Sequence, residues 1–296
     1  ASTNISLVNQ PLRAIINGGS VRTAGEDSPL SIDACGSGDP DDAFSTITYD
    51  WTCAIEVPAV LPSADGSAAP PAPPAAACAV TPPPNTACNW LIPASTLSPN
   101  SYMFNVTVKK VGINEASSAT ARVTMESGIV PEVSIQELAF AKQNPNLKLV
   151  LEGSAFVPAD GATAAITSGF TFEWQVEQGL DVRTGMPLNL SFANVSSTGN
   201  RRSTLVILPN VLTAGAQITL RLVATLEGRS GKAETIIVMN RGPYGGDLLL
   251  SGFTGTAAAL TTDVVITAVN WNDDDTPLRY TFSYGPVGST EAEAKS

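Results

Sequence analysis

The side chains that could carry out chemistry are few, and their types are strongly biased. The 296 residues include 27 Asp and Glu, 16 Lys and Arg, four Cys and no His. Histidine is the usual general base, zinc ligand and switch near neutral pH, so its absence removes three common roles together. Nothing places two carboxylates in an aromatic-lined cleft, as glycoside hydrolysis requires. We therefore expect no enzyme, no cofactor and no catalytic residue.

Two acidic loops are the candidates for metal binding. Asp39 and Asp41 lie in one loop and Asp273 and Asp275 in the other. Clustered carboxylates at the end of a β-sandwich can hold Ca²⁺, which takes six to eight oxygen ligands. Neither loop has the spacing or the glycine of an EF-hand, and Asp and Gly are also ordinary turn formers. Solvated turn residues are the simpler interpretation, and calcium is the alternative.

The four cysteines all lie between positions 35 and 88, and none has C-x-x-C spacing. This favours two disulfides and an oxidising compartment over a metal site. Three connectivities are possible. Cys35 ends a predicted strand, and Cys88 begins the strand expected to pair antiparallel with it. We therefore favour Cys35–Cys88 with Cys53–Cys78, while the sequence leaves the other two pairings open.

Covalent modification is the other chemistry that the sequence suggests. Four N-x-S/T sequons indicate a secreted glycoprotein; they begin at Asn4, Asn105, Asn189 and Asn194. Residues 57–87 form a proline- and alanine-rich insertion that favours polyproline II over a central strand. An inert spacer is the simplest interpretation of this segment. The alternative is hydroxylation and O-glycosylation of its prolines, namely Pro70, Pro71, Pro73, Pro74, Pro82, Pro83 and Pro84.

Strands must position these groups, and the clearest strand is ITYDWTC at 47–53. Its side chains alternate with a period of two, which places Ile47, Tyr49 and Trp51 on one face. A buried tryptophan on a central strand is how a two-sheet sandwich fills its middle. FTFEWQV at 170–176 repeats the pattern around Trp174. The sequence therefore predicts an all-β chain of tandem immunoglobulin- or fibronectin-III-like sandwiches.

The order of the predicted strands repeats along the chain, which indicates duplication and a modular array. We predict modules at 1–128, which carries the insertion, at 129–241, and at 242–296, which begins a third, incomplete sandwich. Besides the two tryptophan strands, the predicted strands are 12–16, 30–34, 90–93, 102–108, 119–125, 133–138, 147–152, 203–209, 218–225, 233–239, 248–250, 263–269 and 278–284.

Several motifs together resemble the receptor-for-egg-jelly (REJ) module of polycystin-type ectodomains. They are LRAIINGG at 12–19, LSIDACGSGDPD at 30–41, YDWTC at 49–53, MNRGPYGG at 239–246, WNDDDTPL at 271–278 and YTF at 280–282. The resemblance implies tandem sandwiches without catalytic activity on a cell-surface or ciliary glycoprotein. The proline-rich insertion departs from the animal pattern. By analogy it suggests an algal version, such as the filament-forming proteins of flagellar mastigonemes.

Charge and hydropathy limit the partners. A net charge of −11 disfavours nucleic acid and anionic lipid, and no apolar run approaches the length needed to insert into a membrane. We expect a structural or adhesive segment of an extracellular or ciliary-surface glycoprotein, whose partners are neighbouring modules and glycans. The alternative is a receptor module that recognises carbohydrate or a protein.

Overall fold

The computed structural model describes residues 10–42, 44–56, 76–159, 164–181, 186–187, 190–252, 264–273, 278 and 280–282. In this part of the chain almost all regular structure is β-strand, and one four-residue helix is assigned. Contacts divide the chain into a compact unit at Asn9–Asn240 and a second unit that contains the residues after it. The predicted all-β fold class is confirmed.

The large unit has two halves. The first half contains β1 (Val21–Gly25), β2 (Leu30–Asp33), β3 (Ile47–Ile55), β4 (Asn89–Ile92), β5 (Ser101–Lys110) and β6 (Ala116–Glu126). The second contains β7 (Glu132–Ile135), β8 (Lys142–Gln143), β9 (Leu149–Phe156), β10 (Thr171–Asp181), β11 (Met186–Pro187), α1 (Phe192–Val195), β12 (Thr204–Ile207), β13 (Gln217–Leu226) and β14 (Arg229–Met239).

The core of the first half lies between the β2–β4 pair and the strands β3, β5 and β6. Alternate residues of β5 are buried, as the period-two pattern predicts. Trp51 is 5% exposed, and its ring meets Trp90 edge to face with centroids 6.0 Å apart. The Trp51 indole N–H donates to the Ala87 carbonyl at 3.0 Å. The predicted burial of Trp51 is confirmed.

The second half repeats this arrangement around Trp174. The three-stranded sheet β12–β9–β7 and the strands β10, β13 and β14 enclose its core, where Trp174 is fully buried. The Trp174 indole N–H donates to the Arg202 carbonyl at 2.9 Å, just before β12. Trp51 makes the equivalent bond just before β4. In both halves the buried indole N–H is therefore satisfied by a backbone carbonyl just before the facing strand.

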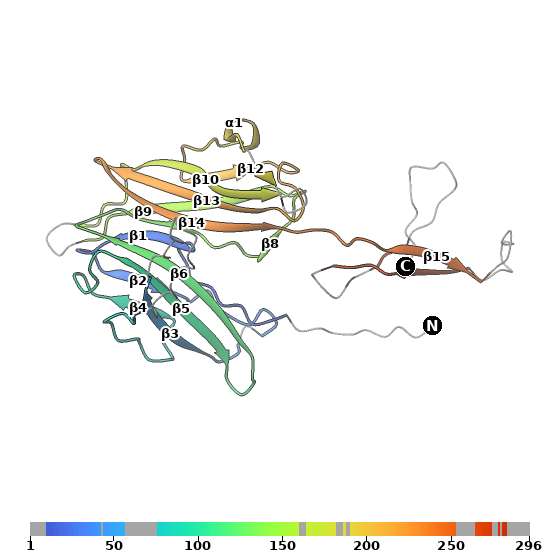
Figure 1. The fold of residues 1–296 in the computed structure, drawn as a ribbon, viewed down its shortest axis with the longest axis horizontal. Coiled ribbons are helices and arrows are strands. Elements are labelled where there is room, and N and C mark those ends of the chain that lie inside the picture. The colour runs from blue at the N-terminus through green and yellow to red at the C-terminus, as the bar shows by residue number, and fades with distance from the viewer. Residues whose placement is uncertain are drawn as a thin grey trace, which may run out of the picture. The chain divides into compact units, whose positions relative to one another are not determined.

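One large sheet joins the two halves. Its strand order is β11–β10–β13–β14–β1–β6–β5–β3, and β8 adds to β14. In Figure 1 the blue strand β1 lies between the green β6 and the orange β14. β1 pairs in parallel with β6 over five residues and antiparallel with β14 at Val21–Glu234 and Arg22–Ala233. The boundaries predicted at 128 and 241 stay predictions, but the halves described here share hydrogen bonds along a common strand.

The approach of β1 to β14 depends on Gly19. Its φ is +102°, and a Cβ there would lie 2.5 Å from the Glu234 carbonyl oxygen. Glycine is the residue that tolerates both conditions. The adjacent Ser20 N–H donates to the same carbonyl at 2.8 Å.

Replacing Gly19 by alanine should therefore weaken the junction between the halves. Gly112→Ala is a matched control, because its φ is +87° but nothing lies within 4 Å of its Cβ position. Both variants carry the cost of positive φ, about 1–2 kcal/mol. The collision at position 19 should lower the free energy of unfolding by about 1–3 kcal/mol more, measured by urea denaturation. Equal losses in the two variants would contradict the close approach.

Two strand predictions are wrong. Residues 12–16 contain only an isolated bridge between Arg13 and Gly38, although Leu12 and Ile16 are buried as expected. The N–H groups of Leu12 and Ala14 donate to side chains, the Glu115 carboxylate and the Ser117 hydroxyl. With these donors occupied, no ladder forms. The described part of 278–284 also contains no strand.

The second unit contains the hairpin of β15 (Asp247–Ser251) and β16 (Val265–Val269). Tyr244 and Asn272 exchange two backbone hydrogen bonds of 2.9 Å at its open end. The Trp271 indole lies against Gly246, where a Cβ would come within 2.0 Å of the ring. Residues of two motifs singled out in the sequence therefore meet in this unit, Tyr244 and Gly246 of one and Trp271 and Asn272 of the other.

Candidate functional site

The seam between the two halves holds a cavity of about 600 Å³. Its walls come from β1 and β2 of the first half and from β7 and β9 of the second. Four carboxylates and one guanidinium line it: Asp33, Glu132, Glu137, Glu152 and Arg22. Sequence reasoning singled out none of these residues, because an isolated charge in a strand pattern is usually solvated.

Arg22 is the positive centre of the cavity. It lies on the inner face of β1, and its guanidinium donates to the Ser31 carbonyl at 2.9 Å and the Asn17 carbonyl at 3.4 Å. Gly18 leaves room for it, since a Cβ there would lie 2.6 Å from the Arg22 Nη1. Burial lowers the pKa of Arg22, and the Glu132 and Asp33 carboxylates oppose that change.

Glu132 begins β7 and faces Arg22 from the second half. Burial raises its pKa to about 7, and the attraction of Arg22 only partly offsets this effect. Its Oε1 atom is buried and has no hydrogen-bond partner among the described residues. A carboxyl group in such a place changes charge near neutral pH. The cavity therefore contains a titrating group although the chain has no histidine.

A second arginine clamps the seam near the cavity. Arg13 of the first half donates to the Leu138 carbonyl at 2.7 Å and to the Ala139 carbonyl at 2.5 Å. Burial raises the pKa of the neighbouring Glu137, while the charge of Arg13 lowers it. The contacts of Arg13 and the shared strand β1 fix the two halves against each other at separate points.

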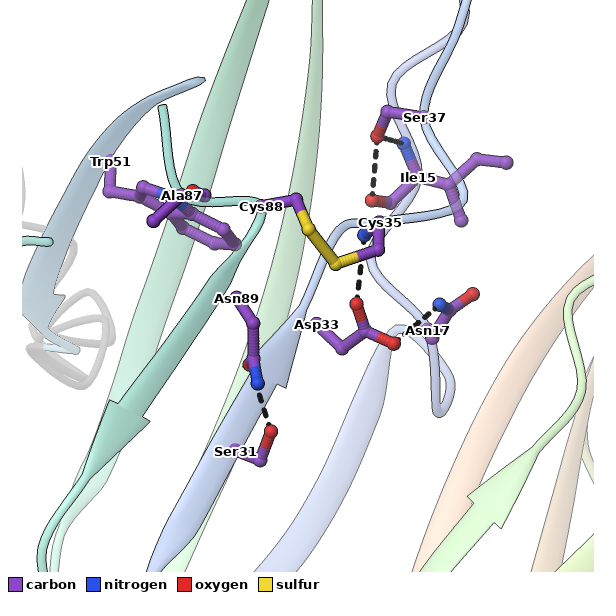
Figure 2. The surroundings of a disulfide bond; sticks show 10 residues. All are labelled: Ile15, Asn17, Ser31, Asp33, Cys35, Ser37, Trp51, Ala87, Cys88 and Asn89. Atoms are coloured by element: carbon purple, nitrogen blue, oxygen red, sulfur yellow. Dashed lines mark hydrogen bonds between the residues drawn. A yellow bond between two sulfur atoms is a disulfide. The ribbon is translucent and has the colours of Figure 1, made fainter. Parts of the chain in front are cut away.

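The cysteines form the favoured pairs, Cys35–Cys88 with Cα atoms 4.8 Å apart and Cys53–Cys78 at 5.4 Å. Figure 2 shows the first bridge crossing between the end of β2 and the start of β4. Beside it the Asp33 carboxylate accepts from the Cys35 N–H and from the Asn17 amide, both at 2.8 Å. The second bridge ties residue 78 to β3, where Ala54 and Ala77 also pair.

The first acidic loop is held by protein groups. The Lys110 ammonium lies 2.5 Å from Asp39 and 3.3 Å from Asp42, and its hydrogen bond is the main cause that lowers the Asp39 pKa. Asp41 accepts from the Gln10 N–H at 2.5 Å. Within the described ranges, no group of three or more His, Cys, Asp or Glu side chains is placed to hold a metal. Asp273 is described and Asp275 lies outside the described residues, so calcium at either loop stays untested.

Two of the four sequons lie in described segments. Asn105 is on β5, where its side-chain amide donates to Thr120 at 2.9 Å, and Asn194 is exposed in α1. Asn4 and Asn189 lie outside the described residues. Of the candidate hydroxyprolines, Pro82, Pro83 and Pro84 are described, whereas Pro70, Pro71, Pro73 and Pro74 are not. Modification at all these positions stays a prediction.

Comparison with known proteins identifies the family of this chain. Residues 1–294 match the REJ domain. The chain belongs to the REJ domain family. Human polycystin-1 is 28% identical to it over 293 residues, which cover 94% of this chain and 6% of polycystin-1. The chain thus corresponds to a small part of that relative, and the REJ resemblance drawn from the motifs is confirmed.

Solved structures resemble this REJ chain only distantly. The N-terminal four Ig domains of Dscam1 isoform 4.44 share 11% identity and cover 97% of this chain and 67% of their own, with a TM-score of 0.24. Extracellular domains 3–5 of Drosophila OTK share 10% identity over 78% of this chain and 63% of theirs, with a TM-score of 0.25. The fold assignment therefore rests on the strand pairing.

Membership of the REJ family and the two disulfides together indicate an extracellular, receptor-like module. Among the described residues, no helix has the length and hydrophobicity that a bilayer crossing needs. Two structural features of this REJ chain bear on its role. The charged cavity at the seam is relevant to ligand binding, and the Cys35–Cys88 bridge between β2 and β4 is relevant to mechanical support.

Proposed function

We propose that this chain is a non-catalytic structural or adhesive segment of a large extracellular glycoprotein, in which the two halves act as one rigid body. The observation that carries the proposal is the sheet that runs through both halves by way of β1. A hinge between independent modules would bend at a linker. Here β1 bonds to both halves and Arg13 adds a clamp.

Pulling on single molecules tests this role. If the halves resist force together, residues 10–240 should unfold in one main step that releases about 60 nm of chain, because the Cys35–Cys88 bridge keeps the 53 residues that it spans from extending. The Gly19→Ala variant is compared with the wild type. Because the junction between its halves is weaker, its halves should unfold in two separate steps. Two separate steps in the wild type, a shorter one for the disulfide-bridged first half and a longer one for the second, would contradict a rigid body.

We further propose that the glycoprotein lies on the surface of a cilium or flagellum and carries N-glycans at its sequons. Its partners are neighbouring modules, and by analogy with the mastigoneme proteins these modules assemble into filaments. Imaging of the native material together with intact-mass glycan analysis tests both statements. Repeated lateral contacts in filaments support the structural role. Unmodified protein dispersed as single particles would contradict it.

A ligand-binding receptor module is the second candidate, and the seam cavity favours it. The cavity has a volume of about 600 Å³, and the Glu132 Oε1 within it lacks a partner among the described residues. A panel of saccharides and peptides tested for a rise in melting temperature discriminates the two roles, because a ligand of the folded state stabilises it. Loss of that rise in Glu132→Gln would place the ligand in the seam.

A further inference from the structure

Glu132 occupies an unusual position between the two halves. It stands at the start of β7, next to the residues that connect the halves, and its side chain lines the seam cavity. Closing the seam removes the carboxyl group from water, and one of its oxygens has no hydrogen-bond partner in the described residues. Opening the seam would return that group to water. The charge state of Glu132 and the closure of the seam are therefore linked.

The cation that faces Glu132 cannot fully compensate for its charge. The two terminal nitrogens of Arg22 donate to carbonyls of the first half, at Asn17 and Ser31. Those contacts hold the guanidinium on its own side of the cavity, so it attracts Glu132 without pairing with it. Burial consequently outweighs attraction at this carboxyl group.

The other charged groups around Glu132 do not reverse this balance. Asp33 on β2 and Glu152 on β9 line the same cavity and add negative charge. Glu137, beyond β7, lines it too and lies beside Arg13. On β13 and β14, Arg221 pairs with Glu234 on the opposite face of the large sheet, and Lys232 shares that face. Arg229 at the start of β14 donates to the Ile129 carbonyl.

We propose that Glu132 makes the seam pH-sensitive: the protonated carboxyl favours the closed seam, and the carboxylate favours its opening. The sign follows from the raised pKa of about 7 in the closed state, against 4.5 for the ordinary group. Closure is favoured in full below the lower value, weakens as the pH rises between the two, and is weakest above the upper one. The module thus tightens in mildly acidic surroundings.

Hydrogen exchange at the seam tests the proposal on the intact chain. The reporter amides are Ser20, which donates to Glu234, and Lys232, which donates to the Thr23 hydroxyl. Their protection factors, corrected for intrinsic exchange, should fall roughly ten- to a hundredfold between about pH 5 and about pH 8. The amides of β5 and β13, inside each half, should keep their protection.

Two variants test whether Glu132 causes the pH dependence of the seam protection. Glu132→Gln cannot ionise, so the seam protection should become independent of pH. Glu152→Gln removes a carboxylate from the same cavity, but Glu152 is exposed, so the pH dependence should persist. Constant protection in the wild type, or a change of opposite sign, would overturn the proposal whether or not the variants fold. Persistence of the effect in Glu132→Gln would overturn it as well.

Discussion

Replacing Trp174 by alanine is expected to lower the free energy of unfolding of the large unit by about 3–5 kcal/mol. The indole is fully buried in the second core and is among the largest side chains with no exposed surface. The substitution leaves a cavity and also removes the donor to the Arg202 carbonyl. Urea denaturation followed by far-ultraviolet circular dichroism measures the loss without depending on tryptophan fluorescence.

Trp271→Ala is the matched control for this substitution. Trp271 is 37% exposed and belongs to the other unit, where it lies against Gly246. Its removal should leave the main unfolding transition in place. A loss below about 1 kcal/mol for Trp174→Ala, small for a core tryptophan, would show that the second half has no packed centre.

Removing the Cys35–Cys88 bridge by a double replacement with serine should cost about 4 kcal/mol, because it frees a long loop in the unfolded chain. The two cysteines are 53 residues apart in sequence. The bridge also closes the β2–β4 pair, where the Ala34 N–H donates to the Cys88 carbonyl at 2.8 Å. The midpoint of thermal unfolding should therefore fall clearly, measured without reductant and after mass analysis confirms the remaining bridge.

The Cys53–Cys78 bridge provides the comparison. Its 25-residue separation predicts a slightly smaller cost, about 3 kcal/mol. Its loss should also have a local signature, since the Ile55 N–H donates to the Ala76 carbonyl beside it. The Ile55 amide should exchange faster in this variant and keep its protection when only Cys35–Cys88 is removed. Wild-type stability in both double variants would refute a structural role for the bridges.

The sequence predicts well what depends on alternation along one strand. The residues around Trp51 and Trp174 alternate with a period of two, which predicts that both rings lie in the cores, and both are buried. The favoured cysteine pairing follows from the antiparallel pairing expected for two segments, and these segments form the antiparallel pair of β2 and β4. These inferences needed only local patterns and one pair of neighbouring strands.

The shared sheet depends on contacts that no local pattern records. β1 reads VRTAG, a short segment without a strong alternation, and its partners lie near positions 122 and 234. Arg22 and Glu132 likewise became candidate functional residues only because folding brings them to one cavity. The strand expected at 12–16 does not form for a related reason, since the side chains of Glu115, just before β6, and Ser117, within β6, accept hydrogen bonds from its backbone N–H groups.

The pairing of β1 has a consequence for synthesis on the ribosome. Val21 is synthesised more than two hundred residues before its partner Glu234 in β14. Until then the nascent chain keeps one edge of β1 unpaired, and such an edge can recruit a foreign strand. Translation that stops before β14 therefore yields a fragment in which one edge of β1 stays bare and open to pairing with another chain.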